Sequence, residues 1–126
     1  MSADCTTDFD DWLVASFATS GAFTVLIVLV ETGETSVGLL RSSYLHVIGD
    51  ETRWPEMVRL FAASRAAWNG AAFFRADRTG LVDGATARRR LGALTQHLER
   101  DRSLLGEAEF FNAEGLRLKI EEIRRS

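Results

Sequence analysis

The most apolar stretch of the chain, residues 22–31, predicts a strand that is buried on both faces. Its β-branched and aromatic side chains occupy both alternating sets of positions, so neither face is polar. The rest of the chain or a partner must therefore cover each face. The turn at 32–34 predicts an antiparallel return through 36–41. Residues 44–48 follow either as a further strand or as its continuation past a bulge at 42–43.

Apolar residues recur at helical spacing over residues 8–18 and predict a short amphipathic helix. Thr7 or Asp8 can act as its N-cap, and Gly21 can end it. A longer helix is predicted over residues 83–103. Its first residue is an aspartate that can cap the free amides of the first turn, and its leucines form one stripe.

The clearest helix begins near Pro55, because a missing N–H costs nothing in the first turn, and ends at Gly70. Its large apolar side chains fall within one arc, so we expect an aromatic ridge that packs on the sheet. Arg65 lies inside the same arc, where an apolar residue is expected. The ridge consists of Trp54, Phe61 and Trp68, with Met57 and Val58 beside them.

Three more strands are predicted at 71–76, 108–113 and 116–122, of which the last two form a hairpin. The first two share the pattern A-x-F-F-x-A, which either marks two equivalent strands or arises by chance in an alanine-rich chain. The hairpin signals favour an α+β fold over a doubly wound parallel sheet. We expect a single two-layer domain over 1–126, with 1–7 as a mobile tail, a mostly antiparallel sheet of about five or six strands, and two or three helices on one face.

The composition is that of an ordinary globular domain, with 126 residues, 46% hydrophobic and 26% charged. The single cysteine, Cys5, cannot form an internal disulfide, and no cluster of cysteine and histidine suits zinc. We therefore expect a reducing, cytoplasmic setting and no metal or other cofactor. The 15 basic residues include 14 arginines, and 16 residues are alanine. This bias is typical of a high-GC coding sequence and indicates a bacterial source.

Two features superficially indicate other classes of protein. Residues 12–30 carry no formal charge and are long enough to span a membrane, but acids flank them on both sides and the first basic residue is Arg41. The arginine run at 88–90 would suit phosphates, but successive helical residues point in three directions and the pI is near 5.4. We expect neither a membrane nor a nucleic acid as partner.

No motif in the chain specifies a reaction. The sequence has no glycine-rich phosphate loop, zinc-protease motif or nucleophile elbow. The segment 77–88 lacks the glycine and glutamate that a calcium loop needs. These absences favour a non-catalytic protein. His46 is notable because Tyr44 and Asp50 lie in phase with it, as an acid/base group with an orienting carboxylate requires, although a strand histidine more often has a structural role.

Two functional hypotheses follow. The first is a non-catalytic module that acts by association with proteins, most simply as a homodimer, since few helices are available to cover both faces of the strand at 22–31. The second is a binder or enzyme for a small anionic metabolite, whose pocket lies between the Trp54/Trp68 helix and the strand that carries Arg41 to His46. The candidate ligand-binding residues are Arg41, Tyr44, His46, Trp54, Arg65 and Trp68.

Overall fold

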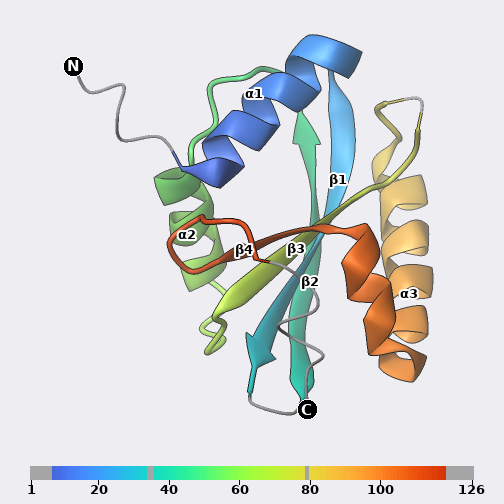
Figure 1. Ribbon diagram of the computed structural model, residues 1–126. Coiled ribbons are helices and arrows are strands. Elements are labelled where there is room, and N and C mark those ends of the chain that lie inside the picture. Colours follow the sequence, from blue (N-terminus) through green and yellow to red (C-terminus); the bar gives the residue numbers. More distant parts are fainter. Residues whose placement is uncertain (1–6, 34–35, 79, 119–126) are drawn as a thin grey trace.

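The computed structural model describes residues 7–33, 36–78 and 80–118 and shows an α+β fold with one four-stranded antiparallel sheet (Figure 1). The strands follow the order β2-β1-β3-β4 across the sheet. The elements, in chain order, are α1 (Asp8–Ser20), β1 (Phe23–Thr32), β2 (Val37–Val47), α2 (Trp54–Ala62), β3 (Gly70–Arg75), α3 (Gly84–Arg100), the 3-10 helix η2 (Arg102–Glu107) and β4 (Glu109–Asn112).

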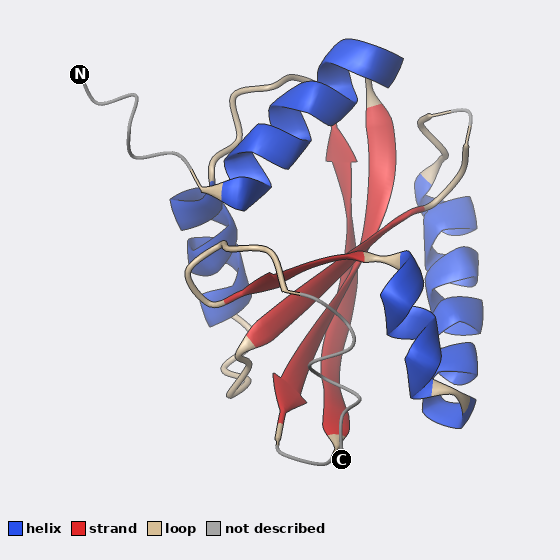
Figure 2. Cartoon of the chain, in the orientation of Figure 1, coloured by secondary structure: helices blue, strands red, loops and turns tan. Residues whose placement is uncertain are grey.

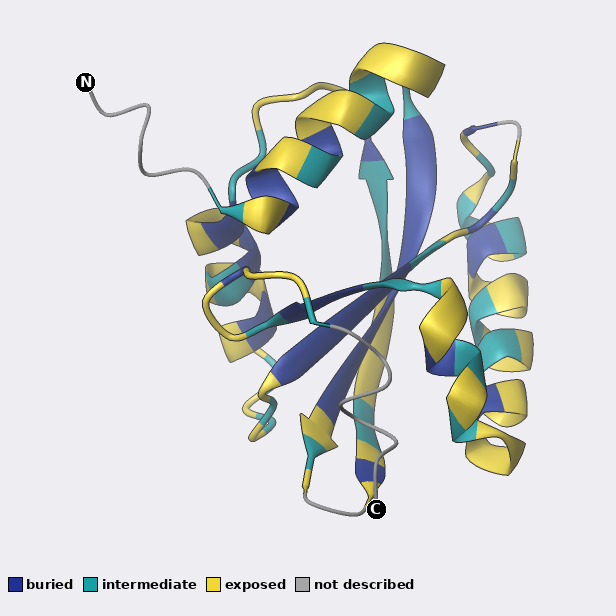
Figure 3. Cartoon of the chain, in the orientation of Figure 1, coloured by how far each residue is buried: buried dark blue, intermediate teal, exposed yellow. Residues whose placement is uncertain are grey.

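β1 lies inside the sheet and is buried along both faces, as its sequence predicts. Every residue from Phe23 to Val30 is buried (Figure 3). β2 pairs with one side of β1 and β3 with the other, both antiparallel. The odd-numbered side chains of β1 pack towards α1 and α2, whereas Val28 and Val30 pack towards α3 and η2.

Helices cover both faces of the sheet, so the domain has three layers instead of the two that the sequence led us to expect (Figures 1 and 2). α1 and α2 bring Phe9 and Phe61 onto one face, where they pack in a cluster with Phe111. α3 and η2 bring Leu98 and Leu105 onto the other face. The chain therefore covers its own central strand on both sides, and no partner is needed for that purpose.

The described residues contain four strands, fewer than the five or six expected. Within residues 36–48 the chain forms one strand, β2, so the second of the two alternatives, a continuation past a bulge, is the one formed. The last predicted strand, 116–122, is represented by an isolated bridge between Phe111 and Arg117, and its part from residue 119 onward lies outside the described residues. β3 and β4, which carry the shared A-x-F-F-x-A pattern, are direct antiparallel neighbours.

β2 contains a bulge two residues earlier than predicted. Leu29 of β1 lies opposite Arg41, whereas Val30 lies opposite Leu39, so Leu40 is the extra residue. A one-residue insertion reverses the faces that alternate side chains occupy. Leu39 therefore packs on the α3 side, while Arg41 faces α2.

α1 begins where the sequence predicts and ends two residues later. Thr7 is its N-cap: its Oγ1 accepts the backbone N–H of Asp10 at 3.2 Å, and the Asp10 carboxylate accepts the backbone N–H of Thr7 at 3.1 Å. Gly21 ends the helix in the left-handed region, with φ at 73°. Of the expected N-terminal tail, 1–7, the structure describes only Thr7.

α2 is shorter than predicted. Pro55 occupies its first turn, as expected, but the helix ends at Ala62. The side chain of Asn69 pairs instead with β1, where its Oδ1 accepts the backbone N–H of Thr32 at 2.8 Å. Gly70 is the first residue of β3 and not a helix stop, so the prediction of a helix up to this glycine is wrong.

Candidate functional site

The tryptophans among the six candidate ligand-binding residues belong to the core. Trp54 is 3% exposed. Its ring N–H donates to the carbonyl of Ala113 at 2.9 Å, and its backbone N–H donates to Asp10 Oδ1 at 2.7 Å. Trp68 packs edge-on against Trp54, with ring centroids 6.1 Å apart. Neither ring lines the cavities described below.

Arg65 lies beyond the C-terminal end of α2, so its predicted place within the helical arc is wrong. The residue is exposed, and its φ of 58° falls in the left-handed region. The chain turns here and leaves the helix direction. The aromatic ridge therefore does not hold Arg65 over a site.

Tyr44 and His46 lie on the face of the sheet that α3 covers. Tyr44 Oη accepts a hydrogen bond from Arg88 of α3 at 3.1 Å. His46 Nδ1 lies 2.9 Å from Thr24 Oγ1, and its ring packs against that of Tyr44 with centroids 5.5 Å apart. Among the described residues, no hydrogen bond or ion pair joins His46 to Asp50. The acid/base arrangement considered from the sequence is therefore not formed there.

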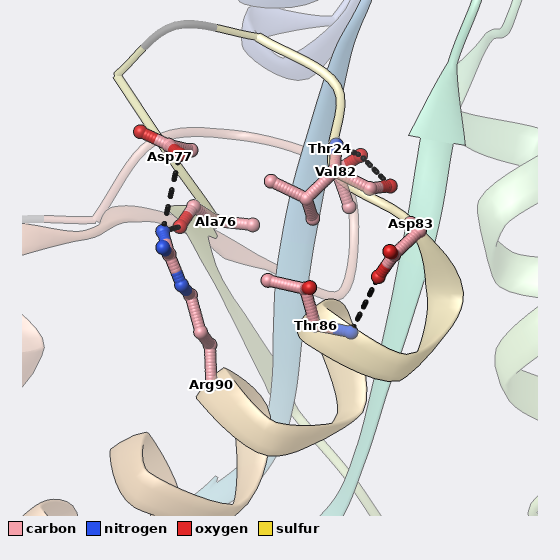
Figure 4. A network of polar contacts seen from close by, with 7 residues as sticks. All are labelled: Thr24, Ala76, Asp77, Val82, Asp83, Thr86 and Arg90. Carbon is pink, nitrogen blue, oxygen red and sulfur yellow. Dashed lines mark hydrogen bonds and ion pairs between the residues drawn. The ribbon is translucent and has the colours of Figure 1, made fainter.

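The buried hydroxyl of Thr24 anchors the loop before α3 to the sheet (Figure 4). Thr24 is fully buried, and Val82 donates its backbone N–H to Oγ1 at 3.0 Å. The same oxygen lies 2.9 Å from His46 Nδ1 and 3.4 Å from the carbonyl oxygen of Val82. His46 thus has a structural partner on β1.

Two further residues, Asp83 and Arg90, hold the N-terminal part of α3 in place (Figure 4). Asp83 is the predicted N-cap: its Oδ1 accepts the backbone N–H of Thr86 at 2.7 Å. This backbone hydrogen bond is the main reason that the pKa of the Asp83 carboxyl lies below its ordinary value. Arg90 donates to the carbonyl of Ala76 at 2.6 Å and pairs with Asp77 at 3.3 Å, so it is engaged within the fold.

A small cavity, here called the α2 cavity, lies between β2 and the C-terminal half of α2. Its volume is about 190 Å³. Buried apolar side chains of β1 and α2 form its floor, and polar side chains of β2 and the α2 terminus form much of its rim. Arg41 is the one candidate ligand-binding residue that lines it. The lining consists of Ile27, Leu29, Arg41, Ser42, Ser43, Leu60, Phe61 and Ser64.

β2 is an edge strand of the described sheet, and half of its backbone groups face away from β1. The carbonyls of Thr24 and Val30 accept hydrogen bonds on the β3 side. In an antiparallel ladder successive residues bond to opposite neighbours, so the odd-numbered residues of β1 bond to β2. The register then turns the N–H and C=O groups of Ser42, Tyr44 and His46 outward. We call the segment 41–47 the free edge.

A second, more open cavity flanks the free edge on the α3 side. Neither α2 nor α3 covers the middle of β2, where residues 41–43 are exposed. Ile48 follows the free edge directly and, at 70%, is the most exposed large hydrophobic side chain of the described residues. The second cavity is lined by Val28, Leu39, Leu40, Arg41, Ser42, Thr95 and Glu99.

The described residues contain neither a metal-ligating cluster nor a membrane-spanning helix. No group of three or more histidine, cysteine, aspartate or glutamate side chains that could hold a metal ion occurs within 7–33, 36–78 and 80–118. No helix in these ranges is long and apolar enough to cross a membrane. The uncharged run that begins at Trp12 is divided between α1 and β1.

Comparisons with protein-family models, with curated proteins and with solved structures give no match to this chain. The function therefore has to be argued from its geometry. Two features carry chemistry that can be tested, namely the free edge of β2 and the α2 cavity beside it.

Proposed function

We propose that this protein is a non-catalytic association module that forms a homodimer through the free edge of β2. Its own helices cover both faces of the sheet, so the surface that remains open to a second strand is the edge of the sheet at β2, where backbone N–H and C=O groups are unpaired within the described residues. An unpaired edge is a template for another strand. The observation that carries the proposal concerns the outward backbone groups of Ser42, Tyr44 and His46. Among the described residues they have no backbone partner.

The free edge is self-complementary. The bulge at Leu40 ends the regular part of β2 and leaves a segment whose midpoint is Tyr44. When a second copy pairs antiparallel about this midpoint, Ser42 of each copy faces His46 of the other, and the two Tyr44 residues face each other. Each such pair exchanges two hydrogen bonds. A two-fold dimer thus uses every outward group of the segment.

The same register separates like charges and covers apolar surface. Arg41 is the one arginine of the segment and lies opposite Val47 of the second copy. The two Arg41 residues are then about 20 Å apart along the strands, well beyond the screening length of about 8 Å. Ile48 of the second copy falls opposite Leu40, beside the second cavity. The exposed isoleucine therefore gains apolar neighbours in the dimer.

The N-terminal part of β2 is not available to a second strand, because arginine side chains already occupy two of its backbone carbonyls. Arg102 Nε donates to the outward carbonyl of Val37 at 2.8 Å. Arg41 Nη1 donates to the carbonyl of Leu40, the bulged residue, at 3.0 Å. Bulges and long basic side chains are common means by which proteins block sheet edges. Pairing is therefore directed to the free edge.

We propose a bacterial cytoplasm as the setting. The single cysteine, Cys5, cannot form an internal disulfide, which suits a reducing compartment. The excess of arginine and alanine suits a high-GC genome. Fractionation of cells that express the full chain tests the compartment, and recovery of the protein outside the cytoplasmic fraction would contradict it.

Light scattering after size exclusion tests the dimer. At about 100 μM we expect twice the chain mass of 14.0 kDa, with dissociation on dilution. The variant Ser42→Pro removes an outward N–H without breaking a bond to β1, so it should be monomeric at the same concentration. Ser42→Ala keeps the N–H and should remain a dimer. A monomeric wild type, or a folded Ser42→Pro dimer, contradicts the proposal.

Amide hydrogen exchange of the wild type gives a second measurement that does not depend on a variant. In the dimer, the amides of Ser42, Tyr44 and His46 should be protected, and they should lose protection as the protein is diluted. The amides of Ser43 and Leu45 bond to β1 and should stay protected at every concentration. Rapid exchange of the outward amides in concentrated protein contradicts the proposal.

A further inference from the structure

We infer that the α2 cavity binds a small monocarboxylate whose apolar part is the size of one aromatic ring or a short branched chain. The inference does not depend on the dimer, because all the residues that form the cavity belong to one chain. It assigns a ligand class to a cavity beside the free edge, whose rim includes Arg41, Ser42 and Ser43 of that edge. The size, the polarity and the charge of the cavity support it separately.

The volume sets the size of the ligand. The α2 cavity measures about 190 Å³. An apolar cavity of about 150 Å³ holds a benzene ring, so this one accommodates a ring or a chain of similar bulk. The cavity exists because Ser43 pairs with Ile27 across the strands and is too small to fill the space beside it. α2 ends at Ala62 and adds no further turn to cover it.

The floor of the cavity is apolar and buried. Ile27, Leu29 and Phe61 are 1%, 4% and 5% exposed. A site lined in this way binds the apolar part of a ligand, and a few polar groups at its rim fix the orientation. The hydroxyl of Ser64 is already engaged, since it donates to the carbonyl of Phe61 at 2.7 Å and accepts the N–H of Ala66 at 3.2 Å. It therefore shapes the rim and does not hold the ligand.

The charge at the rim selects an anion. Arg41 forms no ion pair with a carboxylate of the described residues, and Nη1 is its one nitrogen with a hydrogen bond there, to the carbonyl of Leu40. A guanidinium has five N–H donors, so donors remain for a carboxylate. The hydroxyl of Ser43 makes no hydrogen bond within the described part of the chain and adds another donor at the rim. An apolar floor with a cationic rim recognises an amphiphilic anion.

The proposed dimer leaves the cavity available. In the pairing about Tyr44, Leu45 of the second copy faces Ser43 at the open side of the cavity. Leu45 already packs against the core of its own chain, so it borders the cavity without filling it. The ligand and the second copy therefore occupy adjacent places.

Titration with benzoate, followed by methyl NMR of Ile27 and Leu29, tests the inference in the full chain. We expect saturable shifts with a Kd at or below about 1 mM. Benzyl alcohol, of matched shape but neutral, should bind about tenfold more weakly, and Arg41→Gln should remove that preference. Arg59→Gln changes an exposed arginine of α2 outside the cavity and should bind benzoate like the wild type.

Filling the cavity gives the complementary result. Ser43→Leu places a side chain in the space and should abolish the binding of both probes while the chain remains folded. Shifts that do not saturate by about 10 mM benzoate, or equal affinity for the alcohol in the wild type, would overturn the inference. Wild-type protein, diluted until light scattering shows a monomer, should still bind benzoate, because every residue that lines the cavity belongs to one chain. Failure of the dimer and failure of the ligand site are therefore distinguishable.

Discussion

Replacement of Thr24 by valine tests whether a buried hydroxyl holds the loop before α3. Valine has nearly the same shape, so packing is preserved while the oxygen is lost. The hydroxyl has one proton, which it can give to His46 Nδ1 at 2.9 Å or to the Val82 carbonyl at 3.4 Å. The N–H of Val82 donates to it at 3.0 Å in either case. The substitution therefore breaks two short hydrogen bonds.

The expected loss of stability follows from the groups left without a partner. An unsatisfied buried donor or acceptor costs about 1–3 kcal/mol. Val82 and His46 are half-buried, so water replaces part of each bond and the lower end of the range applies. At about 1 kcal/mol for each of these two groups, we expect Thr24→Val to lower the free energy of unfolding by about 2 kcal/mol. Thr24→Ser keeps the oxygen and loses one buried methyl group, worth about 1 kcal/mol.

Urea unfolding of the two variants and the wild type provides the measurement. With an m-value of about 2 kcal/mol/M, the midpoint of Thr24→Val should fall by about 1 M, and that of Thr24→Ser by about half as much. Amide exchange at Val82 should accelerate in the valine variant alone. A valine variant that is as stable as the serine variant, with unchanged exchange at Val82, would refute the anchoring role of the hydroxyl.

Further substitutions probe other contacts of the fold. Gly115→Ala should lower stability by about 2 kcal/mol or more, since φ is 82° and the new Cβ would lie 2.7 Å from the Trp54 ring. Gly92→Ala, where the Cβ meets nothing within 4 Å, should raise it by about 0.5–1 kcal/mol. For either glycine, a urea midpoint that does not move in the stated direction would contradict that prediction. Asp10→Ala leaves the backbone N–H of buried Trp54 without its acceptor and should cost about 1–3 kcal/mol by the same assay, whereas a loss below about 0.5 kcal/mol would show that this bond is dispensable. The lowered pKa of Asp83 means that its stabilising effect is present above about pH 3.8 and is lost as the pH falls through its folded-state pKa. The difference in melting temperature between wild type and Asp83→Asn should therefore shrink below that pH, and a constant difference would show that the charge of the carboxylate does not stabilise the helix start.

Local signals in the sequence identified the elements whose cause is local. Thr7 caps α1, Pro55 lies in the first turn of α2 and Asp83 caps α3, because each acts on amides within a few residues of itself. The burial of β1 on both faces was equally visible, since its own side chains have no polar face. The end of α2 at Ala62 was not visible in the sequence. Asn69 pairs with Thr32, 37 residues away, and the periodicity of the helix carries no trace of that contact.

The candidate site depended still more on contacts between distant residues. Arg41 stands out in the sequence and lines the α2 cavity. The bulge at Leu40 precedes Arg41, Tyr44 and His46, so regular alternation places Arg41 on the opposite face of the sheet from the other two. A bulge at 42–43, as predicted, would have placed all three on one face. A bulge is a property of two paired strands, and the alternation within one strand does not reveal it.

Local patterns in the sequence were sufficient to predict an α+β fold, the caps of α1 and α3, and a central strand without a polar face. Those patterns do not show that helices from the same chain cover both faces of the sheet, or that β2 is left as an edge strand. A cap and an apolar pattern that favours burial each depend on a residue and its near neighbours. Which strand becomes an edge depends on how strands pair across the whole chain. The backbone groups of Tyr44 point away from the sheet because the even-numbered residues of β1 form their hydrogen bonds with β3 and not with β2.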